Sequence, residues 1–162
     1  EYLIKKGYKK IAHITGPKEN EDAVKRLQGF TDALKKHGLK VNKSWIVEGK
    51  FTIDSGVDCF NKIISLKEKP EVIFAGNDMM AIGCYNAARL NKIKIPTDIA
   101  IAGFDDIFIS QYLTPRLTTI NVPIYEIGLH AAKMLLQRLN SNENYKPQHL
   151  KIPTTLVEGE SC

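Results

Sequence analysis

Two carboxylates follow directly after an almost unbroken apolar run. The run extends from Ile99 to Phe104, and Asp105 and Asp106 come next. A strand without polar positions is typical of a parallel sheet that is covered on both faces. Open α/β sheets bind ligands beyond the carboxyl ends of such strands, and an aspartate can accept hydrogen bonds from two neighbouring hydroxyl groups. The sequence therefore predicts that this pair lies at a ligand-binding edge.

Other chemically useful side chains follow earlier apolar runs in the same way. Phe51 comes soon after the run that ends at Glu48, and Asn77 soon after the one that ends at Ala75. An amide donates and accepts hydrogen bonds, a guanidinium presents a fork of donors, and an aromatic ring stacks on C–H groups. A neutral polyhydroxy ligand such as a sugar needs this combination. The predicted ligand contacts are Arg26, Phe51, Asn77 and Asp105.

Each of these side chains also has a purely structural explanation. Arg26 can be a solvated helix residue, Phe51 a core residue and Asn77 a helix N-cap. Either aspartate of the pair can cap a helix or form a turn. The convergence of several such residues on one edge favours ligand contact over these separate explanations.

Catalysis receives little support from the sequence. A Mg²⁺-dependent phosphatase could use Asp105 and Asp78, but it would also need a lysine and a hydroxyl residue at matching strand ends. Lys50 and Thr15 fit those roles only loosely. Among the four histidines there is no metal-pair spacing and no evident neighbouring nucleophile, and His13, inside a strand, is predicted to be a core residue with satisfied hydrogen bonds. The sequence predicts a protein that is not an enzyme, with no cofactor and no metal site.

A repeated pattern of strand and helix must position the candidate residues. Apolar runs and helical periodicity predict strands at 11–15, 45–48, 71–75 and 98–104, and helices at 20–37, 52–66 and 79–90. Strands that alternate with helices form right-handed crossovers and a parallel sheet with helices on both faces. The predicted fold class is α/β with a parallel doubly wound sheet.

The remainder of the chain departs from this alternation. A fifth apolar run at 117–120 precedes a predicted long helix at 124–139, a polar stretch at 140–144 and two short β-like pieces at 150–152 and 155–157. The tail therefore does not continue the repeat of a parallel strand followed by a helix.

The predicted helix at 79–90 is apolar nearly all round, which indicates that more than one of its sides is buried. One side must meet the sheet. The other can meet a second subunit or another layer of the same chain. The subunit alternative is preferred, and it makes Ile82, Tyr85 and Tyr112 the predicted homodimer interface.

Composition is that of an ordinary soluble domain. The 162 residues are 43% hydrophobic and 25% charged, enough for one sizeable core. No apolar run is long enough to span a membrane and no signal segment opens the chain, so we expect a cytoplasmic protein. Cys59, Cys84 and Cys162 have neither disulfide nor metal spacing. The net charge of +5 is interpreted as a solvated lysine surface in preference to a nucleic-acid contact.

The chain begins on a stretch that looks like the end of a helix. Gly7 is placed to cap that helix, and the first residue is Glu1, with no initiator Met. These features predict a fragment of a longer protein.

Several ordered motifs together resemble the effector-binding core of LacI/GalR-family transcriptional repressors, which is similar to sugar-binding periplasmic proteins. The motifs are Gly16-Pro17 with Arg26-Leu27-Gln28-Gly29-Phe30, Gly49-Lys50-Phe51, Asn77-Asp78-Met79-Met80-Ala81-Ile82-Gly83, Gly103-Phe104-Asp105-Asp106, Tyr112-Leu113-Thr114-Pro115 and Leu117-Thr118-Thr119. The last two favour the repressors over the periplasmic proteins. The resemblance implies the same four effector contacts as the residue chemistry, and it makes Asp106 structural.

The resemblance also implies two lobes joined by crossing segments. Residues 1–120 and 150–162 would form the C-terminal lobe, and 121–149 would belong to an N-terminal lobe that is otherwise missing, together with the DNA-binding headpiece. A sugar-like effector would bind between the two lobes of the effector-binding domain. In a homodimer of such chains, it would control the binding of operator DNA through the headpiece. A solute receptor of transport or chemotaxis remains an alternative, as does the phosphatase.

Two positions depart from the family pattern. Val122 stands where many relatives have Gln, which removes a hydrogen bond to the sugar and leaves the effector's identity open. The segment before Ser161 lacks the arginine common at that place.

Overall fold

A computed structural model describes residues 1–140 and 148–162 of the chain. Most of the predicted polar stretch at 140–144, and part of the segment 121–149 assigned to a second lobe, lie outside the described residues. Within the described residues, no helix is both long enough and apolar enough to cross a bilayer.

Four short strands form one parallel sheet in the order β2-β1-β3-β4. Their bounds are β1 (Ile11–Thr15), β2 (Ile46–Glu48), β3 (Val72–Ala75) and β4 (Ala100–Ala102). The predicted α/β class and parallel sheet are confirmed. The strand predicted at 98–104 is longer than β4, because the chain turns toward Asp105 after Ala102. Trp45 belongs to a short 3₁₀ helix, η1 (Lys43–Trp45), and not to β2.

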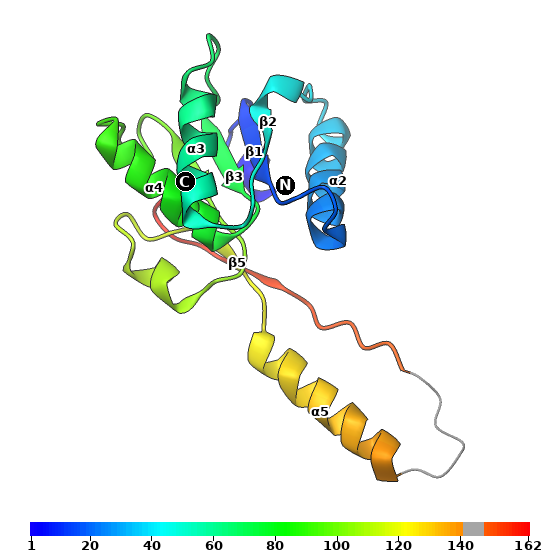
Figure 1. Ribbon diagram of the computed structural model, residues 1–162. Coiled ribbons are helices and arrows are strands. Elements are labelled where there is room, and N and C mark those ends of the chain that lie inside the picture. The colour runs from blue at the N-terminus through cyan, green and yellow to red at the C-terminus, as the bar shows by residue number, and fades with distance from the viewer. Residues whose placement is uncertain (141–147) are drawn as a thin grey trace.

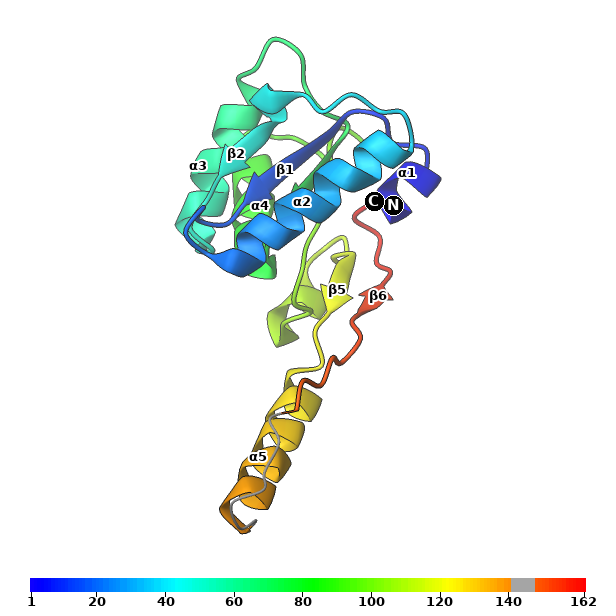
Figure 2. The ribbon, with the colours of Figure 1, turned by 90° about the vertical axis from the view of Figure 1, so that its right-hand side faces the viewer.

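Helices cover both faces of this sheet. The helices α3 (Ile53–Ile64) and α4 (Asp78–Leu90) lie on one face, and α1 (Tyr2–Lys5) and α2 (Glu21–Lys36) on the other (Figures 1 and 2). The three long helices that pack on the sheet, α2, α3 and α4, each begin at a residue whose side chain accepts a hydrogen bond from the first turn: Asn20, Thr52 and Asn77. These caps satisfy backbone N–H donors that the helix itself leaves free. The three predicted helix starts are confirmed within one residue.

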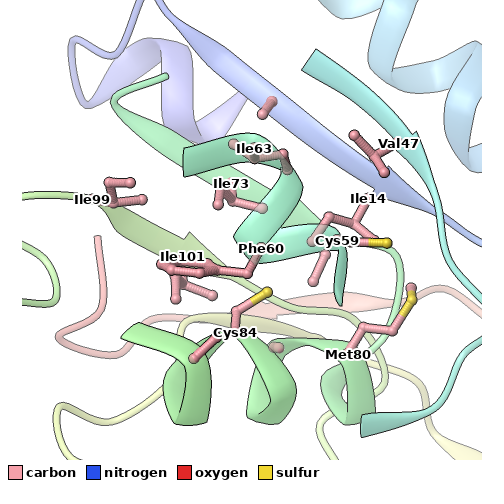
Figure 3. Packing of buried hydrophobic residues seen from close by; sticks show 14 of the residues in the cluster. Ile14, Val47, Cys59, Phe60, Ile63, Ile73, Met80, Cys84, Ile99 and Ile101 are labelled. Carbon is pink, nitrogen blue, oxygen red and sulfur yellow. The ribbon is translucent and has the colours of Figure 1, made fainter. Parts of the chain in front are cut away.

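The larger core cluster lies between the sheet and the pair α3 and α4 (Figure 3). Ile14, Ile73 and Ile101 reach it from three strands, and Phe60 and Cys84 reach it from the two helices. A smaller cluster on the α2 face is formed by Ile11, Leu34, Val72 and Ala100. Strands with apolar residues on both faces therefore account for the unbroken apolar runs of the sequence.

The helices α3 and α4 pack so closely that glycines stand at their contact. A Cβ atom on Gly83 would lie 2.1 Å from the Ile53 carbonyl oxygen, and one on Gly56 would lie 2.2 Å from the Met80 carbonyl oxygen. The second apolar side of α4 is thus covered largely by α3. This is the same-chain alternative, whereas the apolar pattern was interpreted in favour of a second subunit.

The chain leaves the sheet through β5 (Thr119–Asn121), which pairs antiparallel with β6 (Thr155–Val157). The β-like piece predicted at 150–152 is not a strand, and only the piece at 155–157 is confirmed. Beyond β5, the helix α5 (Ile124–Asn140) projects away from the sheet (Figures 1 and 2). None of these described helix residues is buried.

The last residues of the chain extend the hydrogen bonding of β4. The Ser161 hydroxyl donates to the Ile101 carbonyl oxygen at 2.6 Å and accepts from the Thr118 backbone N–H at 2.8 Å. The Ile101 N–H in turn donates to the Ser161 carbonyl oxygen at 2.9 Å. Ser161 is fully buried and joins two segments that are 43 and 60 residues away in the sequence.

Replacing Ser161 with Ala is expected to destabilise the fold by about 1–3 kcal/mol, because the buried Thr118 N–H loses its acceptor. Urea unfolding of the variant measures this loss. Ser65→Ala is a suitable control, since the Ser65 hydroxyl bonds only to the Lys62 carbonyl oxygen at an exposed helix end. Equal midpoints for the two variants would contradict the role given to Ser161.

Candidate functional site

Loops at the carboxyl edge of the sheet bring the four predicted ligand contacts together. Arg26 reaches this edge from the second turn of α2. Its Nη1 donates to the Gly76 carbonyl oxygen at 2.8 Å, and its guanidinium lies 4.1 Å from the ring centre of Phe104 and 5.7 Å from that of Phe51. One carbonyl and two aromatic rings thus hold the guanidinium, so the interpretation of Arg26 as a freely solvated helix residue is wrong.

Phe51 lies over the backbone of Gly16. A Cβ on Gly16 would come within 1.9 Å of the Phe51 ring, so only glycine at that position leaves room for the ring. The ring is half-buried, and φ of Phe51 is 59°, a conformation that costs a bulky residue free energy. The half-buried ring presents an apolar face beside Arg26.

Asn77 makes hydrogen bonds through both ends of its side-chain amide. Its Oδ1 accepts from the Met80 N–H at 3.0 Å, as the N-cap of α4, and its Nδ2 donates to the Phe51 carbonyl oxygen at 3.2 Å. The structural explanation, an N-cap, is therefore correct. Because an NH₂ group has two hydrogens, Asn77 has a second donor besides the one that is bonded to Phe51.

Asp105 and Asp106 have positive φ values of 117° and 56°. Among the described residues, the two aspartates and Phe51 are three of the four non-glycine residues with left-handed φ; the fourth is Lys92. Such backbone strain concentrates at functional sites. Asp105 is held by its backbone, since its N–H donates to the Ile120 carbonyl oxygen and its own carbonyl accepts from the Val122 N–H.

The carboxylates of this pair have different environments. Asp106 accepts from the Asn121 side chain at 2.8 Å and from the Ser110 hydroxyl at 3.5 Å, which fits the structural role expected for it. For Asp105, partial burial raises the pKa above its ordinary value, and the nearby Arg26 charge opposes that rise. Its carboxylate is half-buried beside a cation, which is the environment expected of an acceptor for ligand hydroxyls.

Asp78 does not reach the edge where a ligand could bind. It is fully buried, and its oxygens accept from the Thr119 hydroxyl at 2.6 Å and the Ile107 N–H at 3.0 Å. Burial raises the pKa of Asp78 to about 6 despite these two bonds. A phosphatase mechanism that pairs Asp78 with Asp105 would need this carboxylate at the surface, and the structure places it in the interior.

Sequence reasoning missed the part played by Phe104. Its ring is the nearer of the two rings to the Arg26 guanidinium, and its carbonyl oxygen accepts from the Asp78 N–H at 2.8 Å. A pocket of about 330 Å³ is lined by Arg26 and Phe104 together with apolar residues, most of which come from α1 and α2. The sequence contained one signal for this contact, because Phe104 is an aromatic residue directly before Asp105 and Asp106.

His13 is buried as predicted, but its hydrogen bonds are only half satisfied. The Nδ1 atom lies 2.8 Å from the Phe74 carbonyl oxygen, which requires that this nitrogen carry the proton. The Nε2 atom is buried without a partner, and the ring stacks on Phe74 with ring centres 4.7 Å apart. Burial lowers the pKa of His13 to about 4.

His13 and Asp78 should affect acid stability in opposite directions. His13 stays neutral in the fold, so its contribution is complete above the unfolded pKa of about 6.5 and is lost as pH falls toward 4. The raised pKa of Asp78 acts the other way, because the cost of its buried charge is relieved as pH falls from about 6 toward 4. Each shift corresponds to about 3 kcal/mol, so the two largely cancel.

Replacing Asp78 with Asn removes the compensating ionisable group. The single amide oxygen can still accept from the Ile107 N–H, and the NH₂ group can donate to the Thr119 hydroxyl oxygen, so that bond reverses its direction. We expect the variant to lose up to about 3 kcal/mol more stability than the natural protein between pH 7 and pH 4. Urea unfolding at pH 7, 6, 5 and 4 measures this difference. Parallel stability curves for the two proteins would show that Asp78 is ionised throughout this range.

The three residues predicted for a dimer interface lie around one surface groove of about 730 Å³. Ile82 and Tyr85 come from α4, and Tyr112 comes from the 3₁₀ helix η2 (Phe108–Tyr112). Tyr85 donates to the Pro115 carbonyl oxygen at 2.8 Å, whereas Tyr112 is 64% exposed and stacks edge-on against Phe108.

Comparisons with known proteins agree with this fold. The family described as "Periplasmic binding protein-like domain" matches residues 1–162. The chain is 37% identical over all of its 162 residues to the ribose operon repressor of Escherichia coli K12, and 38% identical over 160 residues to the HTH-type transcriptional repressor PurR of Shigella dysenteriae. It covers 49% and 47% of these two proteins, so it spans about half the length of the curated relatives.

Solved structures give the same result. A putative transcriptional regulator LacI from Bacillus cereus subsp. cytotoxis superposes with a TM-score of 0.94, and a complex of the transcriptional regulator CelR with cellobiose with a TM-score of 0.92. Both are 30% identical to this chain, cover 99% of it, and are themselves covered to 57% and 49%. The chain belongs to the periplasmic binding protein-like domain family, within its LacI/GalR group of transcriptional regulators.

Proposed function

We propose that this chain is the effector-sensing part of a LacI/GalR-type regulator and that a small sugar-like molecule binds at the carboxyl edge of its sheet. The observation that carries the proposal is the connected set of Arg26, Phe51, Asn77 and Asp105. Arg26 lies beside Phe51, and Asn77 is bonded to the Phe51 carbonyl oxygen. The Arg26 charge also acts on the pKa of Asp105.

A neutral polyhydroxy ligand fits the chemistry of this set. The Asp105 carboxylate can accept from two adjacent hydroxyls, Arg26 and Asn77 can donate to ring or hydroxyl oxygens, and Phe51 can stack on a C–H face. One guanidinium balances one carboxylate, so the set has no excess positive charge. The ribose operon repressor and the cellobiose complex among the similar proteins support a sugar.

Regulation would depend on a second lobe. We assign residues 1–120 and 150–162 to one lobe and 121–149 to the other, because α5 projects from the sheet with Leu135, Leu136 and Leu139 more than half exposed. A ligand held between two lobes acts only through its different affinities for their relative orientations. The outcome in the intact cytoplasmic protein would be a change in operator binding by a separate DNA-binding headpiece.

Homodimer formation through the groove at Ile82, Tyr85 and Tyr112 completes the proposal. The exposed ring of Tyr112 is an aromatic anchor of the kind enriched in protein interfaces. A two-fold dimer would let the two headpieces address two half-sites of an operator.

A thermal-shift screen of the intact regulator against pentoses, hexoses, their phosphates and nucleobases tests the proposal. A ligand at 100 times its dissociation constant stabilises the folded state by about 2.7 kcal/mol. A shift with one sugar supports the proposed effector class. Stabilisation only by a nucleobase or a sugar phosphate would contradict the neutral sugar and leave the family assignment intact.

A further inference from the structure

The edge of the sheet opposite the candidate site carries most of the basic residues. Four segments lead into the amino ends of the parallel strands: 1–10, 35–45, 62–71 and 89–98. They contain 14 of the 23 lysines and arginines of the chain but only 4 of its 18 acidic residues. Because the four strands are parallel, segments that are far apart in the sequence meet at one edge, away from α5 (Figure 1). We call this surface the basic edge.

Every lysine and arginine of the basic edge is exposed. Three of these lysines make ion pairs with acidic residues: Lys10 with Glu68, Lys36 with Glu1, and Lys6 with Glu158. A positive charge in the last turn of a helix is explained by the helix dipole, which accounts for the basic residues that end α2, α3 and α4. It does not account for those beyond the helix ends, which include Lys40, Lys67, Lys69, Lys92 and Lys94.

The rest of the sequence has the opposite balance, with 14 acidic and 9 basic residues. The net charge of +5 therefore combines two unlike regions, because the four segments together have a formal charge of +10. Glu158, which pairs with Lys6, adds one negative charge at this edge. Clustered charge of one sign produces a surface potential that attracts counter-charged partners and speeds association with them. These basic side chains are solvated, as the sequence predicts, but the parallel topology gathers more than half of the basic residues of the chain at one edge.

The composition of the basic edge favours a polyphosphate partner over a protein. Stable protein interfaces are built around buried aromatic and aliphatic anchors. Among large hydrophobic residues in these four segments, all of which the structure describes, only Leu90 is exposed, at 63%. Flexible, strongly hydrated lysine charges without apolar anchors suit the repeated charges of a nucleic-acid backbone, which such residues bind without reading the sequence.

We propose that the basic edge binds the phosphate backbone of double-stranded DNA independently of sequence. The contact is separate from any operator recognition by a headpiece and does not depend on the effector proposal. It would hold the regulator near DNA during its search for a site, because counter-ion release gives affinity for any duplex.

Fluorescence anisotropy with a labelled 30-base-pair duplex of random sequence and the 162-residue chain tests this. We expect binding at about 50 mM salt that weakens steeply as salt increases. A variant with Lys67, Lys69, Lys92 and Lys94 changed to Glu should bind at least tenfold more weakly. Its slope of log affinity against log salt should be smaller in magnitude by about 3 to 4, since each phosphate contact contributes roughly 0.9.

A matched variant separates location from net charge. Changing Lys18, Lys50, Lys133 and Lys151 to Glu alters the charge equally but away from the basic edge, and it should leave affinity within about threefold and the slope nearly unchanged. Circular dichroism confirms that both variants fold. Equal weakening by the two variants, or no binding at 50 mM salt, would overturn the proposal. Binding of poly-glutamate without binding of the duplex would also overturn it and would indicate an acidic protein partner.

Discussion

Replacing Asp105 with Asn is expected to weaken effector binding by the intact regulator about 100-fold while leaving the fold intact. Hydrogen bonds to a charged acceptor contribute about 1.5–3 kcal/mol each, and the substitution removes the charge and one of two acceptor oxygens. Asn is preferable to Ala here, because φ at this position is 117° and Asn tolerates positive φ better than other non-glycine residues. Isothermal titration with the sugar found in the screen measures the loss.

Asp106→Asn is the matched control for this experiment. It removes a neighbouring charge from a residue that also has positive φ, but its carboxylate bonds to Asn121 and Ser110 and is not assigned to the ligand. We expect its affinity to stay within a few fold of the natural protein, and both variants to melt within a few degrees of it. If Asp105→Asn binds normally, or if both variants lose affinity equally, the assignment of Asp105 as a direct ligand contact is wrong.

Local sequence rules predicted the α/β architecture well. The strand and helix bounds follow from apolar periodicity, and the side chains that begin the long helices, such as Thr52, are ordinary N-caps. The loops at one edge follow from parallel topology alone, which is why Arg26 and Asn77 could be grouped without a structure.

Features that depend on contacts between distant segments could not be predicted in this way. Nothing near Asp78 in the sequence indicates that Thr119 will bury and bind its carboxylate. The unpartnered Nε2 of His13 likewise depends on the packing of α2 and β3 around β1. The basic edge was missed for the same reason, since its lysines are dispersed along the chain and meet only after the sheet has formed.

The assignment of a second subunit to α4 shows a further limit of periodicity. An all-round apolar helix indicates two buried sides, but it does not say which element covers the second. Gly56 and Gly83 indicate that the covering element is α3, because residues without a side chain let the backbones of α3 and α4 come into contact. Ile82 and Tyr85 remain half-buried at the margin of this contact, so the proposed dimer needs only the edge of the helix and not its whole apolar face.

Replacing Gly83 with Ala is expected to be among the most damaging single changes in the fold. The added methyl group would lie 2.1 Å from the Ile53 carbonyl oxygen and 2.8 Å from the Val57 nitrogen, so α3 must move. Overpacking of this kind costs about 3 kcal/mol, which corresponds to a melting temperature roughly 10 °C lower in a domain of this size.

Gly29 provides the control, because it is also inside a helix but has no atom within 4 Å of an added Cβ. Gly29→Ala should stabilise the protein by about 0.5–1 kcal/mol, since alanine loses less backbone entropy than glycine in a helix. Differential scanning calorimetry should therefore show a lower melting temperature for Gly83→Ala and a higher one for Gly29→Ala. If both variants were stabilised, α3 and α4 would have room between them, and the close contact of their backbones would be refuted.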